Sequence, residues 1–255
     1  MRNRSLHGGR HELGQNFLIH RPTIRRIGEL VADTEGPILE IGPGDGALTV
    51  ELATLGRSIR AVELDERRAR RLRERLPGVD VRHGDALRVG FDAPVVVGNI
   101  PFHLTTPVLR RILTSGSWRR AILLTQWEVA RKRAGIGGGT MMTAQTSPWF
   151  EFELRGRVPS HAFRPMPSVD GGILSITRRG SPLLSSAERR RYEAFVRDVF
   201  TGRGRGIAQI LRARRGATPE LVTAGLRRAD IRPSALPRDL DALQWAALWT
   251  SLHDR

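Results

Sequence analysis

The sequence predicts an α/β protein whose open sheet is followed by a small all-helical C-terminal region. Up to about residue 179, short runs rich in valine, isoleucine and leucine alternate with stretches of helical spacing. Beyond that point the strand-like runs stop, and helical segments follow one another with prolines and glycines between them. We therefore expect two domains, 1–179 and 180–255, and a flexible basic arm at residues 1–12.

The first half of the chain gives the clearest elements. Pro22 is placed to open the first helix, and Gly36-Pro37 breaks the chain after it. The apolar runs that follow are too short for helices, so we interpret them as buried strands. The expected strands are 38–41, 58–63, 79–83, 93–98 and 118–124. The expected helices are 22–32, 47–53, 65–76 and 105–113.

The second half is more basic and richer in glycine. A helical piece at 128–134 carries Arg131, Lys132 and Arg133 and is followed by the glycine run 135–140. We interpret this run as a lid or a substrate-contact loop, with a disordered connector as the alternative. The later expected strands are 149–158 and 172–177. The expected C-terminal helices are 185–200, 207–212, 219–227 and 240–252.

Groups that can contact a ligand follow the first three strands. The first strand runs into a glycine turn, 42–46, whose Gly-x-Gly-x-Gly spacing differs from the dinucleotide-binding pattern and favours a nucleoside without a pyrophosphate. Glu63 ends the second strand, about twenty residues further on, where an acidic group accepts hydrogen bonds from ribose hydroxyls. Asp85 follows the third strand and can accept from an adenine amino group; a turn cap is its alternative role.

The fourth strand leads into the tetrapeptide Asn99-Ile100-Pro101-Phe102. It supplies a side-chain amide, a stiffened turn with a free carbonyl and an aromatic face, which together suit a planar ring that bears an amino group. The alternative is a strand-terminating turn whose Phe packs in the core. In order, the four strand ends describe one crevice that holds an adenosine moiety beside a base, and an S-adenosylmethionine site of the class I type matches it best.

Composition points to a nucleic-acid partner. The chain has 42 Lys and Arg against 26 Asp and Glu, a formal charge of +16, and Lys132 is its single lysine. Such an excess of positive charge favours a polyanion, and the lack of a long apolar stretch disfavours a membrane interior. There is no cysteine, so we expect no disulfide, no thiolate metal site and no thiol nucleophile, and a reducing cytoplasmic setting.

The chain resembles the erythromycin-resistance (Erm) family of 23S rRNA adenine-N6 methyltransferases and, more broadly, the rRNA adenine dimethyltransferases. Six stretches carry the resemblance: Leu13–Leu18 (LGQNFL), Glu40–Gly46 (EIGPGDG), Val62–Asp65 (VELD), Gly84–Ala86 (GDA), Asn99–Phe102 (NIPF) and Phe163–Val169 (FRPMPSV). The helical C-terminal part matches in helical character and basicity more than in motif. The fold implied is a class I, Rossmann-like methyltransferase sheet.

The resemblance also implies roles for single residues. S-adenosyl-L-methionine would be contacted by Asn16, Leu18, Gly42, Gly44, Glu63, Leu64, Asp85, Ala86 and Asn99. The catalytic group would be Asn99, Ile100, Pro101 and Phe102, with Phe102 stacked on the target adenine. Phe163 would assist at the base, and Arg131, Lys132 and Arg133 would touch RNA. The expected protein is a cytoplasmic monomer that acts on 23S rRNA and confers macrolide-type resistance, with no metal and no membrane association.

Four other functions were weighed against this one. A 16S rRNA adenine dimethyltransferase of ribosome assembly is the nearest, but such relatives usually show Asn-Leu-Pro-Tyr-Asn where this chain has Ile100, Phe102 and His103. A DNA adenine methyltransferase would be expected to show Asp/Asn-Pro-Pro-Tyr. A non-catalytic nucleic-acid-binding relative is disfavoured by the intact Glu63, Asp85 and Asn99. The glycine spacing and the charge disfavour an NAD-dependent reductase.

Overall fold

The computed structural model describes residues 16–214 and 216–253. The predicted basic arm and the first three residues of the LGQNFL motif lie outside the described residues. Two compact units are present: one joins the described residues up to Ala130 with Arg155–Ser175, and the other joins Arg131–Leu154 with the chain from Ile176 onwards. The units thus group 131–154 with the C-terminal helices, and the domain boundary at residue 179 stays a prediction.

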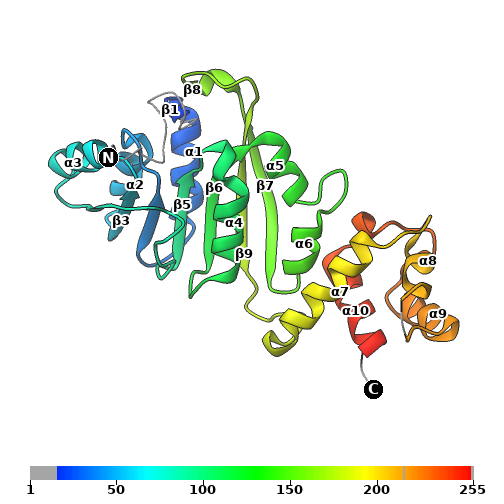
Figure 1. The fold of residues 1–255 in the computed structure, drawn as a ribbon. Helices are drawn as coiled ribbons and strands as arrows, with labels where there is room; N and C mark the ends of the chain where they lie inside the picture. Colours follow the sequence, from blue (N-terminus) through cyan, green and yellow to red (C-terminus); the bar gives the residue numbers. More distant parts are fainter. Residues whose placement is uncertain (1–15, 215, 254–255) are drawn as a thin grey trace, which may run out of the picture. The chain divides into compact units, whose positions relative to one another are not determined.

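A seven-stranded sheet has the strand order β4-β3-β2-β5-β6-β9-β7 (Figure 1). Its strands are β2 (Ile38–Ile41), β3 (Ile59–Glu63), β4 (Asp80–His83), β5 (Val95–Asn99), β6 (Arg120–Gln126), β7 (Phe150–Val158) and β9 (Gly171–Arg178). The five strands from β4 to β6 are parallel. Their carboxyl ends therefore lie along one edge, and Gly98 pairs with Ile41 on one side and Leu123 on the other.

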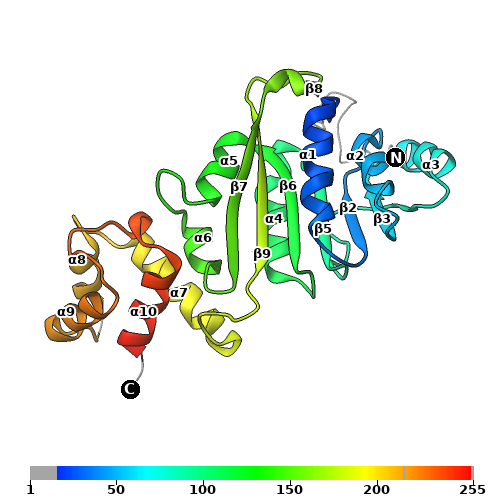
Figure 2. The same cartoon turned by 180° about the vertical axis from the view of Figure 1, so that it is seen from behind.

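Helices cover both faces of the parallel strands. In Figure 1 α4 lies in front of the sheet, and in Figure 2, seen from behind, α1 does. The helices in or entering the first unit are α1 (Arg21–Ala32), α2 (Ala47–Ala53), α3 (Glu66–Arg75), α4 (Thr105–Thr114), α5 (Trp127–Arg133) and the 3₁₀ turns η1 (Phe102–Leu104) and η2 (Ser160–Ala162). Because both faces are covered, most residues of the central strands are apolar and buried; Val96 and Val97 of β5 are 0% exposed.

A separate two-stranded ribbon joins two segments far apart in the sequence. β1 (Phe17–Leu18) pairs antiparallel with β8 (Phe163–Arg164), so that Leu18 lies opposite Phe163. The sequence predicts loops for both segments, since two residues are too short to show a strand period. The ribbon brings the LGQNFL and FRPMPSV motifs together.

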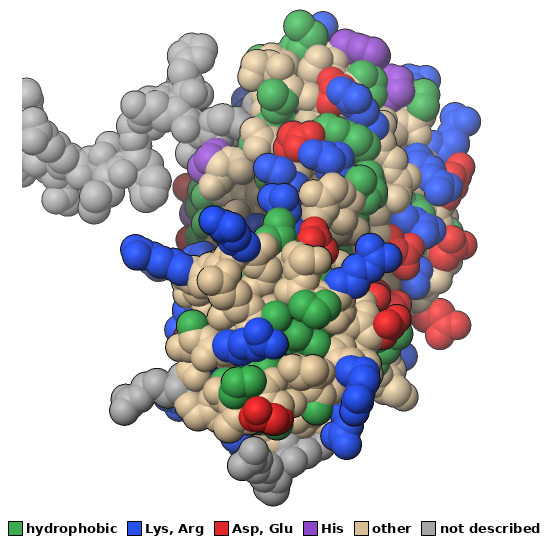
Figure 3. Space-filling view, turned by 90° about the vertical axis from the view of Figure 1, so that its right-hand side faces the viewer, with side chains coloured by type: hydrophobic (Ala, Val, Ile, Leu, Met, Phe, Trp, Pro, Cys, Tyr) green, Lys and Arg blue, Asp and Glu red, His purple; other side chains and the backbone are tan. Residues whose placement is uncertain are grey.

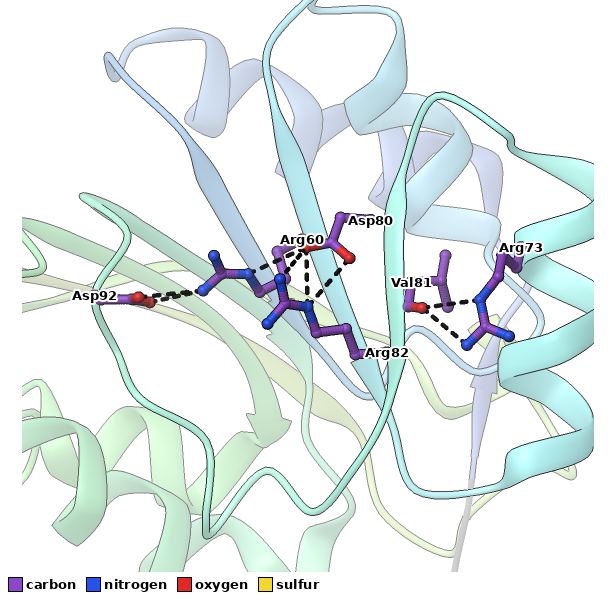
Figure 4. Close-up of polar contacts among 6 residues, drawn as sticks. All are labelled: Arg60, Arg73, Asp80, Val81, Arg82 and Asp92. Carbon is purple, nitrogen blue, oxygen red and sulfur yellow. Dashed lines mark hydrogen bonds and ion pairs between the residues drawn. The ribbon is translucent and has the colours of Figure 1, made fainter.

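At the outer edge of the sheet, arginines are held by acidic neighbours (Figure 4). Arg60 donates to Asp92 at 3.0 Å, and Arg82 lies 2.8 Å from Asp80 on β4. The hydrogen bond from Arg82 holds the pKa of Asp80 below its usual range, and the hydrogen bond from Arg60 does the same for Asp92. Arg73 donates to a backbone carbonyl of β4 at 3.0 Å. These arginines serve the fold at this edge.

The second unit is built on helices around an aromatic core. They are α6 (Met141–Thr146), η3 (Ser186–Glu188), α7 (Arg189–Thr201), α8 (Ile207–Arg212), α9 (Pro219–Arg228), η4 (Pro237–Asp239) and α10 (Ala242–His253). Trp249 packs edge-on against Tyr192 and Phe195, with ring centroids 5.8 and 5.4 Å apart. Tyr192 donates to the Ala144 carbonyl at 2.8 Å, and burial raises the pKa of its hydroxyl. Helix α6, which the sequence analysis missed, begins after Thr140, whose side chain accepts from the Thr143 N–H.

The predicted elements are all present, with ends that differ by no more than about two residues. The predicted fold class, an α/β sheet with a helical C-terminal part, is confirmed. No helix within 16–214 and 216–253 is long and apolar enough to cross a membrane.

Candidate active site

A cavity opens at the carboxyl ends of the parallel strands, and it collects twelve of the predicted site residues. They are Asn16, Leu18, Gly42, Gly44, Glu63, Leu64, Asp85, Ala86, Asn99, Ile100, Pro101 and Phe102. Each comes from the end of β2, β3 or β5, from the loop after β4, or from β1 and the residue before it. Because parallel strands end at one edge, residues as far apart in sequence as Gly42 and Phe102 meet there. Phe163, Arg131, Lys132 and Arg133 do not line this cavity.

The turn after β2 requires glycine at two positions, because glycine has no Cβ. Gly42 and Gly44 have φ of +67° and +57°, in the left-handed region that favours glycine. A Cβ on Gly44 would also lie 2.9 Å from the ring of Phe17. The turn can therefore bring its backbone N–H groups close to the cavity, and Phe17, which also lines the cavity, packs directly upon it.

Two buried carboxyl groups stand on either side of this turn. Glu63, 3% exposed, accepts from the Gly44 and Asp65 N–H groups, both at 2.9 Å. Glu40 is 1% exposed, and its Oε2 has no hydrogen-bond partner among the described residues. Burial, together with the charge of Glu63 and against the effect of the Thr49 hydroxyl, raises the pKa of Glu40 to about 7.

Asp85 serves a turn and faces the cavity at once. Its Oδ1 accepts from the Leu87 N–H at 2.8 Å, which is the capping role weighed as an alternative. Its Oδ2 lies 3.8 Å from Nε of the exposed Arg88, too far for a hydrogen bond. The capping bond fixes the carboxylate and leaves this second oxygen as an acceptor.

The orientation of Asn99 follows from its one hydrogen bond. Its Nδ2 donates to the Asn16 carbonyl at 2.8 Å, so its Oδ1 remains an acceptor with no partner in the described chain. The Pro101 carbonyl accepts from the Leu104 N–H at 2.8 Å. No described N–H donates to the Ile100 carbonyl. The tetrapeptide therefore presents two spare acceptors on successive residues, the Oδ1 of Asn99 and the carbonyl of Ile100.

Phe102 and Phe163 differ in exposure. Phe102 is partly exposed and lines the cavity, whereas Phe163 is 2% exposed and belongs to the hydrophobic core. The rings meet edge to face, with centroids 6.3 Å apart. Phe102 thus offers the aromatic face, and Phe163 supports it from the core side; the direct contact between Phe163 and a base stays a prediction.

The predicted RNA-contact residues belong to the second unit, and two of them bind their own loop. Arg131 donates to the Ile136 carbonyl at 3.2 Å, and Arg133 donates to Thr140 at 2.5 Å. Lys132 is exposed. The glycine run after them is folded into turns, with the Gly139 N–H donating to the Arg238 carbonyl at 2.6 Å. This geometry argues against the disordered connector.

Comparison with known proteins places this site in a family. The family described as ribosomal RNA adenine dimethylase matches residues 6–229. The chain belongs to this family. The mycinamicin-resistance protein MyrB of Micromonospora griseorubida is 52% identical over 246 residues, which cover 95% of this chain and 78% of that protein. An rRNA adenine N-6-methyltransferase of Corynebacterium diphtheriae is 55% identical over 208 residues, or 80% of this chain and 82% of the relative.

A solved structure agrees with the sequence relatives. The crystal structure of the 23S rRNA methyltransferase ErmE superposes with a TM-score of 0.85 at 37% identity, and the match covers 94% of this chain and all of that one. The resemblance that the six motifs indicated is confirmed, and with it the prediction of an rRNA adenine methyltransferase. Membership in this family accounts for a cavity at the strand ends that is lined by Asn99, Ile100 and the aromatic ring of Phe102.

Sequence reasoning missed two parts of the site. The pairing of β1 with β8 sets the position of Asn16, and the carbonyl of Asn16 in turn orients the amide of Asn99. The second part is Arg68, which no motif contains. Its arginine-rich helix was interpreted as a mainly solvated face, and the only signal was its place one turn after the VELD motif.

Proposed function

We propose that this protein methylates the exocyclic N6 of an adenine in the peptidyl-transferase loop of 23S rRNA, with S-adenosylmethionine as donor, and so confers macrolide-type resistance. The observation that carries the proposal is the pair of spare acceptors, Asn99 Oδ1 and the Ile100 carbonyl, beside the partly exposed ring of Phe102. Two acceptors match the two N–H bonds of an adenine amino group. The printed names support this context: MyrB is a mycinamicin-resistance protein, and ErmE is a 23S rRNA methyltransferase.

The cavity suits the donor in its shape and in its polar groups. Glu63 would accept from ribose hydroxyls, the second oxygen of Asp85 from the adenine amino group, and the Gly44 turn would let the chain approach closely. The unpartnered Oε2 of Glu40 is a buried acceptor that a cationic amino group would satisfy. When bound, S-adenosylmethionine supplies an activated methyl group on a sulfonium sulfur.

Asn99 and Ile100 would act by orientation. Their oxygens accept the two N–H groups of the target amine, draw its lone pair out of conjugation with the ring and aim it at the methyl group. Phe102 stacks on the adenine and holds it in plane with the acceptors. The N–H proton is lost after transfer, when the nitrogen has become acidic, so the site needs no strong general base.

Access of an RNA base requires that it leave its stack, which costs a few kcal/mol and favours loop nucleotides. Positive surface charge supplies the compensating affinity. Lys and Arg side chains are spread over the face drawn in Figure 3, with acidic side chains gathered toward its right-hand margin. We propose that the C-terminal helices, where Arg203, Arg205 and Arg212 are exposed, contribute phosphate contacts.

The test is transfer of a tritiated methyl group from S-adenosylmethionine to protein-free 23S and 16S rRNA, with the label mapped by primer extension. Label on an adenine of the 23S peptidyl-transferase loop is the expected result, together with macrolide protection of cells that express the protein. Label on 16S rRNA would replace the proposal with the ribosome-assembly activity. Cofactor binding without label on either RNA would contradict both and favour a DNA substrate or a non-catalytic role.

A further inference from the structure

Arg68, on helix α3, contacts two separate segments that line the cavity, as well as the N-cap of its own helix. Its guanidinium carbon lies 4.2 Å from the centroid of the Phe17 ring. Its Nη1 donates to the carboxylate of Asp45 in the glycine turn, and its Nε lies 3.7 Å from Asp65. The side chain is 27% exposed although the helix is among the most charged in the protein. One side chain therefore links α3, the glycine turn and the N-terminal segment.

Phe17 covers the glycine turn, and few backbone hydrogen bonds hold it there. Its ring packs on Gly44 and lines the cavity. Its strand, β1, is two residues long and pairs only with the equally short β8 in the described chain. Two-stranded pairings of this length are marginal without side-chain packing. The guanidinium of Arg68 supplies such packing through a cation–π contact with the Phe17 ring.

The glycine turn itself has a second support. Arg75, two turns further along α3, donates to the Asp45 carbonyl at 2.5 Å. Asp65 also caps α3 by accepting from the Arg67 and Arg68 N–H groups, so it stays fixed without the Arg68 side chain. Loss of the Arg68 side chain therefore releases Phe17 while the turn and the helix start keep their own hydrogen bonds.

We propose that Arg68 is a positioning residue: it holds Phe17 closed over the glycine turn and so retains the bound cofactor. The inference rests on the proposed cofactor site. A planar guanidinium can stack on a ring with its face and bind a carboxylate with its edge, which the ammonium of lysine cannot do at once. The residue thus acts on the cofactor through Phe17 and makes no contact with the reacting atoms.

The first measurement is calorimetric binding of S-adenosylhomocysteine to the full chain and to Arg68→Gln, with Arg71→Gln on the same helix as the matched control, since Arg71 is exposed. We expect Arg68→Gln to weaken binding about five- to tenfold and Arg71→Gln to leave it unchanged. Arg68→Lys should recover little of the loss. In turnover measurements, the KM for S-adenosylmethionine should rise, whereas kcat and the KM for RNA should stay unchanged. Equal affinities in Arg68→Gln and Arg71→Gln would overturn the proposal.

A second readout needs no cofactor and separates positioning from stability. Hydrogen exchange at residues 16–19 of the free protein should accelerate in Arg68→Gln, while the melting temperature stays near that of Arg71→Gln. In a double-mutant cycle, Phe17→Leu should remove most of the effect of Arg68→Gln. Additive losses would show that Arg68 does not act through Phe17, which would overturn the proposal. If the unmodified protein binds no S-adenosylhomocysteine, the proposed cofactor site has failed, whatever the exchange rates at 16–19 show.

Discussion

The cavity of the first unit and the aromatic core of the second differ in how their polar side chains are bonded. In the aromatic core of the second unit, the Tyr192 hydroxyl and the Trp249 indole N–H both have partners, at 2.8 and 2.7 Å, although the buried Trp245 Nε1 has none in the described chain. Around the cavity, the Glu40 and Asn99 side chains each keep an oxygen without a partner. Since an unpaired buried polar atom is costly, the Oε2 of Glu40 indicates a place where a ligand could complete the bonding, and the Oδ1 of the half-buried Asn99 is available to it.

The largest expected effect tests the second unit. Trp249→Ala removes a side chain that is 1% exposed and that packs on two aromatic rings, so the free energy of unfolding should fall by about 3–5 kcal/mol. Urea denaturation measures this loss, and Trp249→Phe should lose less. Cofactor affinity under native conditions should be unchanged, because Trp249 does not line the cavity. A loss below about 1 kcal/mol would contradict the view that the packing of Trp249 stabilises the second unit.

The next largest effect concerns the spare acceptor. Asn99→Ala should lower the methyl-transfer rate about 10²- to 10³-fold, because the amine loses one of two orienting acceptors. Affinity for S-adenosylhomocysteine should stay within a few fold. Single-turnover kinetics with calorimetry separate the two quantities. Retained transfer would exclude the orienting role of Asn99.

The third effect is a pH dependence. The pKa of Glu40 is raised to about 7 in the folded protein, against 4.5 for the ordinary group. The folded state therefore binds this proton more tightly than the unfolded state does. Its stabilising contribution is therefore complete below about pH 4.5 and is lost as the pH rises to about 7, by about 3 kcal/mol. Glu40→Gln cannot ionise and should flatten this part of the stability curve. Glu74→Gln, on the exposed side of α3, is the matched substitution; equal curves for both would contradict the assignment.

A smaller effect separates the two phenylalanines. Phe102→Ala should raise the activation free energy that corresponds to kcat/KM by about 1–3 kcal/mol, since it removes the ring on which the base stacks. Phe102→Tyr and Phe102→Trp should raise it less. Steady-state kcat/KM for RNA measures the series. An equal loss in all three variants would argue that Phe102 does not stack.

The smallest effect returns to the basic loop. Lys132→Ala should reduce the slope of log affinity for RNA against log salt by about 0.7–0.9, the contribution of one phosphate contact. Arg133→Gln should act instead on the stability of the glycine run, because Arg133 binds Thr140 within its own loop. Filter binding across a salt series, with thermal melts alongside, distinguishes the two. An unchanged slope in Lys132→Ala would show that Lys132 makes no contact with an RNA phosphate.

Sequence alone determined the elements and most of the cavity. Glycines at Gly42 and Gly44, Glu63 at one strand end and Asn99 at another are recognisable because apolar runs, turn residues and their order are local properties of the chain. The topology rule that parallel strands end at one edge then places them together. Family membership followed from the same motifs.

Only the tertiary structure decided the contacts between segments distant in sequence. The ribbon of β1 and β8, the bond from Asn99 to the Asn16 carbonyl and the stack of Arg68 on Phe17 join residues that are 51 to 147 positions apart. Arg68 and Arg71 look alike in sequence, and Phe102 and Phe163 do as well. Their different roles depend on which side chains are covered by segments distant in sequence. The local sequence pattern does not predict this.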